Sequence, residues 1–206
     1  MRVLVIGANG SVGKQAVEKL KASEHEPVAM VRKEEQLSQF EEMGVQTVLA
    51  DLEKDFEKAY DEIDAVIFAA GSGPNTGPDK TIIIDQEGAI EAIDLAKKNQ
   101  VERFVLLSSM GADNPKDAEK IKHYLYAKHR ADVYLKNSGV DYTIVRPGGL
   151  TDDPGTGKVS LEKKQASFGQ IPREDVASVL VHLAGKPEAA NKQWELIEGD
   201  TAISEL

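Results

Sequence analysis

The regular alternation of short apolar runs with amphipathic stretches constrains the fold of this chain more than any other feature of its sequence. Several runs are continuously apolar and rich in β-branched residues, as in strands that are buried on both faces of a parallel sheet. The predicted strands cover residues 3–6, 27–31, 46–50, 65–70, 103–107, 142–145 and 194–197.

Amphipathic stretches between these runs predict helices. In the first of them, Val12, Ala16, Val17 and Leu20 fall on one stripe of a helix. The predicted helices cover residues 11–22, 87–99, 119–137 and 173–184. Strands that alternate with helices favour right-handed βαβ crossovers. The sequence therefore predicts an α/β fold, a Rossmann-type doubly wound parallel sheet with a short C-terminal extension on the substrate side.

The composition fits one ordinary globular domain, which we expect to span residues 1–206. Hydrophobic residues make up 41% of the chain and charged residues 29%. Its 25 Lys and Arg against 35 Asp and Glu give a net charge of −10, which argues against a nucleic-acid partner or an anionic membrane surface. The chain has no cysteine, which excludes disulfides and thiolate nucleophiles.

The sequence offers no clear metal site and no membrane segment. The four histidines are scattered without the spacing of a metal site, so we expect no bound metal. No apolar run approaches the roughly 18–20 residues that span a bilayer, and the N-terminus lacks the long apolar stretch of a signal peptide. We therefore expect a cytoplasmic protein.

Two predicted loops follow the carboxyl ends of predicted strands, which is where ligands bind in open α/β sheets. They cover residues 71–80 and 151–158, and the second leads into a charged segment at 161–164. Residues 81–84 are ambiguous, because their pattern fits either the start of a helix or an extended piece.

Gly7, Gly10 and Gly13 form a G-x-x-G-x-x-G motif between the first predicted strand and the first predicted helix. The first glycine permits a tight turn, the second lets the backbone approach a pyrophosphate, and the third lets helix and strand pack closely. The N–H groups of the helix N-terminus, from Ser11 and Val12 onward, would face the phosphates. Asn9 and Ser11 add hydrogen bonds either to phosphate or to the loop itself. The motif predicts a dinucleotide site.

The end of the second predicted strand indicates which dinucleotide binds. An NAD-selective protein often places a carboxylate there for the ribose 2′-hydroxyl, but this chain has Arg32 and Lys33. Arg binds a 2′-phosphate through two hydrogen bonds, and Lys adds a point charge. The alternative is a solvated pair neutralised by Glu34 and Glu35. We expect NADP(H), with NAD(H) as the less favoured cofactor.

The next two strand ends complete the predicted cofactor site. Asp51, followed by Leu52, either accepts a hydrogen bond from the adenine amino group or caps the following turn. Ala69, Ala70 and Gly71 are small and leave room for the ribose and pyrophosphate.

With these motifs, the chain resembles the atypical branch of the short-chain dehydrogenase/reductase superfamily, which is often labelled NAD(P)-binding or epimerase/dehydratase-like. The resemblance spans nearly the whole chain. It rests on the glycine loop at 7–13, on 51–52, 68–71 and 104–109, on a YxxxK motif at 124–128, and on 145–150 and 173–177. It implies that Ser108, Lys128 and Pro147 also contact the cofactor.

The resemblance also implies catalytic roles. Tyr124 would be the proton donor or acceptor, Lys128 the ribose anchor and Ser109 the group that polarises a substrate carbonyl, with Ser108 in reserve. Tyr124 and Lys128 are four apart on a predicted helix, so they project from one face. A free phenol ionises only near about pH 10, and a nearby ammonium favours the phenolate. The alternative is an ordinary Tyr–Lys pair on an amphipathic helix.

The chain departs from the extended members of the superfamily, because only about 60 residues follow the sixth predicted strand. In this size it is also similar to biliverdin and flavin reductases, which pass hydride to flat conjugated acceptors, and to NmrA-like proteins, which bind the dinucleotide without turnover. We expect an NADP(H)-dependent oxidoreductase for a small carbonyl, quinone or flavin-like acceptor. The alternatives are a redox sensor and a nucleotide-sugar epimerase or dehydratase. The chain would be a monomer or a homodimer.

Overall fold

The body of the protein is a nine-stranded sheet, within the described residues 1–73 and 75–206 of the computed structural model. The strands are β1 (Arg2–Ile6), β2 (Glu26–Val31), β3 (Gln46–Leu49), β4 (Ala65–Phe68), β5 (Arg103–Leu107), β6 (Tyr142–Pro147), β8 (Lys158–Glu162), β10 (Lys192–Glu198) and β11 (Thr201–Ala202). Their order is β11-β8-β10-β6-β5-β4-β1-β2-β3. Neighbours from β3 to β10 are parallel, and β8 and β11 form an antiparallel edge.

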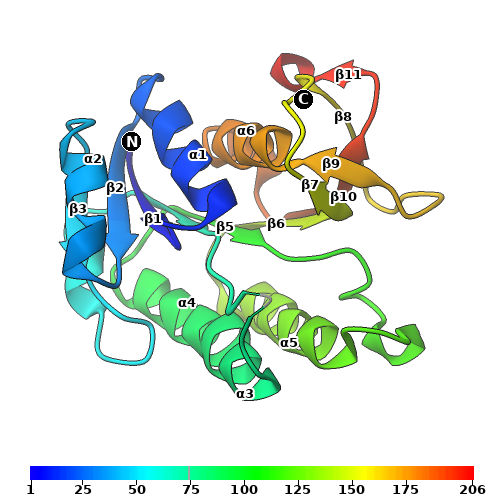
Figure 1. The fold of residues 1–206 in the computed structure, drawn as a ribbon, viewed down its shortest axis with the longest axis horizontal. Coiled ribbons are helices and arrows are strands. Elements are labelled where there is room, and N and C mark those ends of the chain that lie inside the picture. The colour runs from blue at the N-terminus through cyan, green and yellow to red at the C-terminus, as the bar shows by residue number, and fades with distance from the viewer. Residues whose placement is uncertain (74) are drawn as a thin grey trace.

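Helices cover both faces of this sheet (Figure 1). They are α1 (Ser11–Lys21), α2 (Ser38–Glu41), α3 (Pro78–Lys80), α4 (Gly88–Lys98), α5 (Lys122–Ser138) and α6 (Arg173–Ala184). Figure 1 shows α1 and α6 on one face and α4 and α5 on the other. The predicted Rossmann-type sheet is confirmed. Because the chain leaves β1 toward β2 and β3 and then crosses back to β4, the strand order reverses beside β1, which is where such sheets bind ligands.

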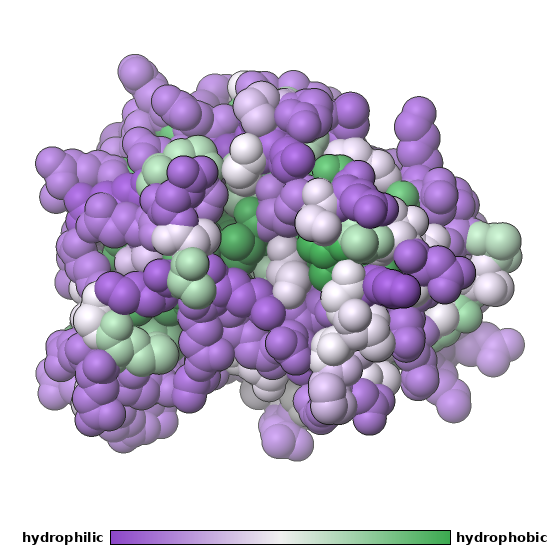
Figure 2. Space-filling view, turned by 90° about the horizontal axis from the view of Figure 1, so that it is seen from above, coloured by the Kyte–Doolittle hydropathy of each residue, from purple (hydrophilic) through white to green (hydrophobic). Residues whose placement is uncertain are grey.

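The alternation of side chains along β1 builds the two hydrophobic cores. Val3 and Val5 belong to the core under α1 and α6, and Leu4 and Ile6 belong to the core under α4 and α5. All four side chains are fully buried. A strand that is covered on both faces must be apolar at every position, which explains its continuous apolar sequence. The helices turn polar side chains outward, and the face seen in Figure 2 is hydrophilic with small apolar areas.

The largest helix boundary error concerns α5, which was predicted from residue 119 and begins at Lys122. Ile121 precedes it with a φ of +48°, in the left-handed region, so the helix cannot extend through this residue. The ambiguous residues 81–84 are helical. They lie in a π-helical segment, η3 (Thr81–Glu87), that joins α3 to α4.

The small strands of the C-terminal part were not predicted. Residues 151–158 were expected to be a loop, but the first of them ends β7 (Gly149–Thr151) and the last begins β8. Residues 161–164 were expected to be a charged segment, and the first two of them belong to β8. β7 pairs with β9 (Gln170–Pro172) in a separate two-stranded sheet. The predicted loop at 71–80 ends in α3, and its Pro74 lies outside the described residues. These short pieces pair with distant segments, so no local periodicity reveals them.

Candidate functional site

The loop between β1 and α1 depends on glycine at two of its three glycine positions. Gly7 has a φ of +87°, and a Cβ there would lie 2.6 Å from backbone atoms of Ala70. A Cβ on Gly13 would lie 2.2 Å from the carbonyl oxygen of Gly7. A Cβ on Gly10 would meet only this oxygen within 4 Å among the described residues, at 3.3 Å. The fold needs Gly7 and Gly13, whereas the space beside Gly10 remains open to a ligand.

The N-terminus of α1 presents backbone donors toward this loop. The first N–H groups of any helix lack partners within the helix, and here they belong to Ser11, Val12 and Gly13. Gly10 is the N-cap and has no side chain to cap them, and no acidic residue lies in the first turn. Val12 is buried, so its predicted contribution comes through its backbone N–H, whereas Ser11 is exposed and its hydroxyl stays a predicted phosphate contact. Such a helix end attracts an anion such as a pyrophosphate.

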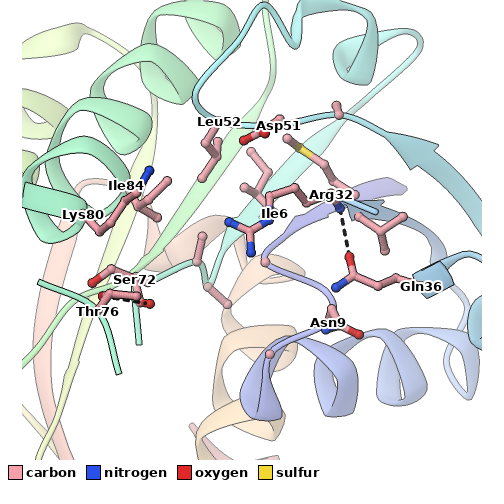
Figure 3. A pocket seen from close by; sticks show the side chains of 18 residues that line it. Ile6, Asn9, Arg32, Gln36, Asp51, Leu52, Ser72, Thr76, Lys80 and Ile84 are labelled. Atoms are coloured by element: carbon pink, nitrogen blue, oxygen red, sulfur yellow. Dashed lines mark hydrogen bonds between the residues drawn. The ribbon is translucent and has the colours of Figure 1, made fainter. Parts of the chain in front are cut away.

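A cleft of about 350 Å³ opens beside the glycine loop, between the carboxyl ends of β1, β2 and β4 (Figure 3). Half of its lining was predicted from the sequence. These residues are Gly7, Asn9, Gly10, Arg32, Asp51, Leu52, Ala69, Ala70 and Gly71. The cleft therefore brings together the predicted pyrophosphate and adenine contacts.

The two cations after β2 have different surroundings. Arg32 extends into the cleft (Figure 3), and no carboxylate lies within ion-pair distance of it in the described part of the chain. Lys33 lies outside the cleft lining, and its Nζ is 3.2 Å from Oε1 of Glu35. Gln36 holds this turn, because its Oε1 accepts the backbone N–H groups of Arg32 and Lys33, both at 3.1 Å. Only Arg32 is thus placed to meet a ligand.

Three polar side chains of the cleft are already held by other residues. Asn9 accepts a hydrogen bond from Nε2 of Gln39 at 2.6 Å, a distant partner that the sequence did not indicate. Asp51 accepts the backbone N–H of Glu53 at 3.1 Å, which is the capping role, while it also lines the cleft. Lys80 enters the cleft lining and pairs with Glu53 at 2.7 Å. These bonds fix the cleft walls before any ligand binds.

The predicted catalytic pair lies outside this cleft, on α5. The Lys128 ammonium lies 5.6 Å from the centroid of the Tyr124 ring. Lys128 is 3% exposed, and its Nζ donates to the carbonyl oxygen of Leu107, at the end of β5, at 3.3 Å. Burial alone would lower the pKa of Lys128, but Tyr124 and Asp85 outweigh it and raise this pKa, so the side chain stays charged. The spacing of Tyr124 and Lys128 on one helix face is as predicted.

The serine pair after β5 divides between the interior and the surface. Ser108 is 2% exposed, and its side chain lies near the carboxylate of Asp132. Asp132 forms a buried ion pair with Arg146 at 2.8 Å. Ser109 is half-buried, and its hydroxyl donates a 3.3 Å hydrogen bond to the carbonyl oxygen of Met110. Of the two hydroxyls, that of Ser109 is the one accessible to a substrate.

Two loops border the carboxyl ends of β5 and β6. Pro147 ends β6, and the loop before β9 crosses directly after it, because Gly149 donates its N–H to the carbonyl oxygen of Gly169 at 2.9 Å. Phe168, in this loop, is 69% exposed and lies over Gly149. Lys164 ties the loop to the one after β5, with its Nζ 2.8 Å from Asp113. These contacts hold the loop that carries Lys164 and Phe168 beside the ends of β5 and β6.

Several lining residues were missed by the sequence analysis. Gln36, Ser72, Thr76 and Lys80 line the cleft but belong to no motif. The sequence could have indicated Ser72, Thr76 and Lys80 only through their place in the predicted loop after β4. Asp85 was also missed, because a carboxylate after the apolar run 82–84 carries no sequence signal that it is buried.

The described residues contain neither a membrane-spanning helix nor a cluster of metal ligands. No helix there is long and apolar enough to cross a membrane. Nor does a group of three or more His, Asp or Glu side chains lie close enough together there to hold a metal ion.

The glycine loop, the switch point beside β1 and the cleft define a dinucleotide-binding protein of the Rossmann type. The chain belongs to the NAD(P)H-binding family, whose model matches residues 7–187, within the atypical short-chain dehydrogenase/reductases. The predicted resemblance is thus confirmed. The chain carries an NAD(P)H-binding domain and is of an oxidoreductase or epimerase-like family.

Similar proteins cover the full length of the chain. One is the "uncharacterized sugar epimerase YhfK" of Bacillus subtilis, 43% identical over 100% of this chain and 98% of the relative. A solved Bacillus halodurans structure with a provisional NAD-dependent epimerase/dehydratase name is 48% identical, with a TM-score of 0.97 over 100% and 97% of the two chains. The solved anaerobillin reductase ChuY of Escherichia coli is 27% identical, with a TM-score of 0.83 over 97% and 98%.

Proposed function

We propose that this protein is an NADP(H)-dependent reductase of the short-chain type, acting on a flat conjugated or small carbonyl acceptor. The observation that carries the proposal is the placement of the Tyr124–Lys128 pair on α5, against the end of β5, in a protein whose β1–α1 loop is shaped for a dinucleotide. The bound cofactor would supply the hydride, and the chain would orient it and manage the proton.

The residues of the cleft fit a dinucleotide. The N–H groups of the first turn of α1 are free of a capping side chain, and Gly10 leaves its surroundings open. These groups would hold the pyrophosphate, Asp51 and Leu52 would border the adenine, and Arg32 would bind the 2′-phosphate. The preference for NADP(H) over NAD(H) rests on the cation at the end of β2, where no carboxylate stands.

On the acceptor side, Tyr124 would donate the proton and Ser109 would hydrogen-bond the substrate carbonyl. Tyr124 is half-buried, and its ring lies beside the Lys128 ammonium on the same helix face, which is the placement that the proposed role of proton donor needs. The exposed ring of Phe168 offers a face on which a flat acceptor can stack. The likeness to an anaerobillin reductase over nearly all of both chains supports such an acceptor.

A sugar epimerase is the second candidate function, and the names of the two Bacillus relatives favour it. An epimerase would use the same tyrosine, but it would return the hydride to its own substrate. A sensor of the cofactor's redox state, without turnover, remains the third candidate from the sequence.

Two assays separate these candidates. The purified protein is mixed with NADPH and, in turn, a flavin, a quinone, a linear tetrapyrrole and small aldehydes, without oxygen, and the loss of NADPH is followed. Oxidation that depends on the acceptor is the expected result. Tight NADPH binding without oxidation by any acceptor would overturn the reductase in favour of a sensor. In a second mixture, of the protein with NADP⁺ and nucleotide sugars, interconversion of the sugars without net change in the cofactor would establish the epimerase.

A further inference from the structure

Asp85 is a buried carboxylate that the proposed chemistry leaves without a role. It lies in η3 and is 1% exposed. Its Oδ2 accepts the backbone N–H of Ser72 at 2.9 Å, and its Oδ1 lies 3.2 Å from Nζ of Lys128. The two oxygens of one side chain thus contact two separate parts of the site.

The first part is the loop after β4. Ser72 lines the cofactor cleft, and so does Thr76, whose hydroxyl donates to the carbonyl oxygens of Ser72 and Gly73 at 3.2 and 3.1 Å. Ser72 also contacts Thr81 in η3 through a hydroxyl pair at 3.2 Å. Asp85 and Thr81 therefore hold the wall of the cleft against η3.

The second part is Lys128 on α5. Its ammonium has three donors; one bonds the carbonyl oxygen of Leu107 and one faces Asp85, which leaves one for a ligand. The ion pair is almost completely buried, with 4% and 0% of the two side chains exposed. Buried ion pairs of this kind contribute little to stability compared with well-packed apolar residues, so their presence asks for another reason.

The local backbone supports a functional reason. A π-helical segment places its residues off the register of the regular helices before and after it, and such segments concentrate at functional sites. In η3 this turns Asp85 into the interior, while its neighbours Ile82 and Ile83 are exposed at 50% and 36%. The chain exposes two isoleucines and buries a carboxylate here, against the usual preference of these residue types.

We propose that Asp85 is a positioning residue that holds the cleft loop at Ser72 and the ammonium of Lys128 at the same time, so that the cofactor cleft and the Tyr124–Lys128 pair keep one fixed relation. This inference rests on the proposed function, in which Lys128 contacts the cofactor. The side chain acts through its two neighbours and touches neither the cofactor nor the acceptor.

The substitution Asp85→Asn tests this role, because an amide has only one acceptor oxygen. The variant can keep the contact to the Ser72 N–H or the contact to Lys128, but not both. We expect NADPH to bind about tenfold more weakly and the kcat/KM for an accepted acceptor to fall by a similar factor. Asp94→Asn is the matched control, since Asp94 is an exposed carboxylate on α4 that contacts Tyr134.

A double-mutant cycle with Lys128→Met distinguishes positioning from a merely structural role. If Asp85 acts through Lys128, Asp85→Asn adds less than about twofold to the loss of NADPH affinity in the Lys128→Met background. Equal losses in both backgrounds would overturn the proposal, as would an Asp85→Asn variant that binds NADPH like the Asp94→Asn control.

The cycle is measured first on NADPH affinity by calorimetry, so it gives an answer even if no acceptor is found. If no acceptor is reduced but the cycle shows coupling between Asp85 and Lys128, the proposed reductase function is overturned and the positioning role of Asp85 stands. Should Asp85→Asn melt below the assay temperature, Asp85→Glu replaces it, because it keeps the charge but displaces both contacts. Wild-type affinity and kcat/KM in Asp85→Glu would overturn the proposal.

Discussion

The two halves of the candidate site are built in different ways. In the nucleotide half, the groups that would hold the pyrophosphate are backbone and glycine from one continuous stretch, residues 7–13. The acceptor half consists of side chains that meet from distant elements, as Lys128 does with Asp85 and Lys164 with Asp113. The difference teaches that the pyrophosphate-binding loop is encoded in one local stretch of sequence, whereas the acceptor half depends on side chains that only the tertiary structure brings together.

The glycine loop gives the sharpest test of the local half. Gly13→Ala places a Cβ 2.2 Å from the Gly7 carbonyl oxygen, so the loop must move, and we expect a loss of about 3 kcal/mol or more in the free energy of unfolding together with loss of NADPH binding. In an ordinary helix position, the same change would stabilise the protein by about 0.5–1 kcal/mol. Denaturant unfolding and calorimetry measure both effects.

Gly10→Ala is the control within the same loop. Its Cβ meets only one atom at 3.3 Å, so the stability should change by less than about 1 kcal/mol, while NADPH binding weakens because the Cβ enters the ligand's space. Equal stability losses in the two variants would contradict the division of roles among the glycines.

Tyr124→Phe tests the chemistry of the acceptor half. Loss of the hydroxyl removes the proposed proton donor, and we expect kcat to fall by about 100-fold or more with NADPH affinity nearly unchanged. Tyr126→Phe, two residues away on the exposed side of α5, is the control and should keep its activity. Full activity in Tyr124→Phe would mean that hydride passes to the acceptor without this acid.

Arg32→Ala tests the choice of cofactor. A bidentate contact to the 2′-phosphate is worth about 1.5–3 kcal/mol, so NADPH should bind roughly 10–100-fold more weakly while NADH affinity stays the same. Lys33→Ala is the control, because Lys33 pairs with Glu35 outside the cleft. Equal affinities of the wild-type protein for NADPH and NADH would contradict the assignment.

Phe168→Ala has the smallest expected effect. The ring is exposed and would contribute only stacking on a flat acceptor, so the KM for that acceptor should rise about 2–10-fold while the kcat stays the same. Val133→Ala removes a different exposed apolar side chain, on α5, and should leave the KM unchanged. An unaltered KM in Phe168→Ala would place the acceptor elsewhere.

The parts of the fold that follow a periodic pattern were predictable. The buried strands, α1, α4 and α6 lie within a few residues of their predicted bounds, because their apolar residues face the sheet. The predicted start of α5 was wrong, because the helix begins only after Ile121, whose backbone is in the left-handed region. A β-branched residue rarely adopts this conformation, so the sequence did not indicate it. The strands of the C-terminal edge were missed because each pairs with a distant partner.

The sequence alone determined that the fold is a doubly wound parallel sheet, that a glycine loop follows the first strand, and that small and charged residues follow the next strand ends. These features could be predicted because backbone sterics, helix termini and burial act on neighbouring residues. Only the tertiary structure decided that Arg32 enters the cleft while Lys33 does not, that Ser108 turns inward and that Asp85 joins Lys128. Whether a charged or polar side chain is buried, paired or free depends on which distant segments pack against it, and packing of this kind has no local signature.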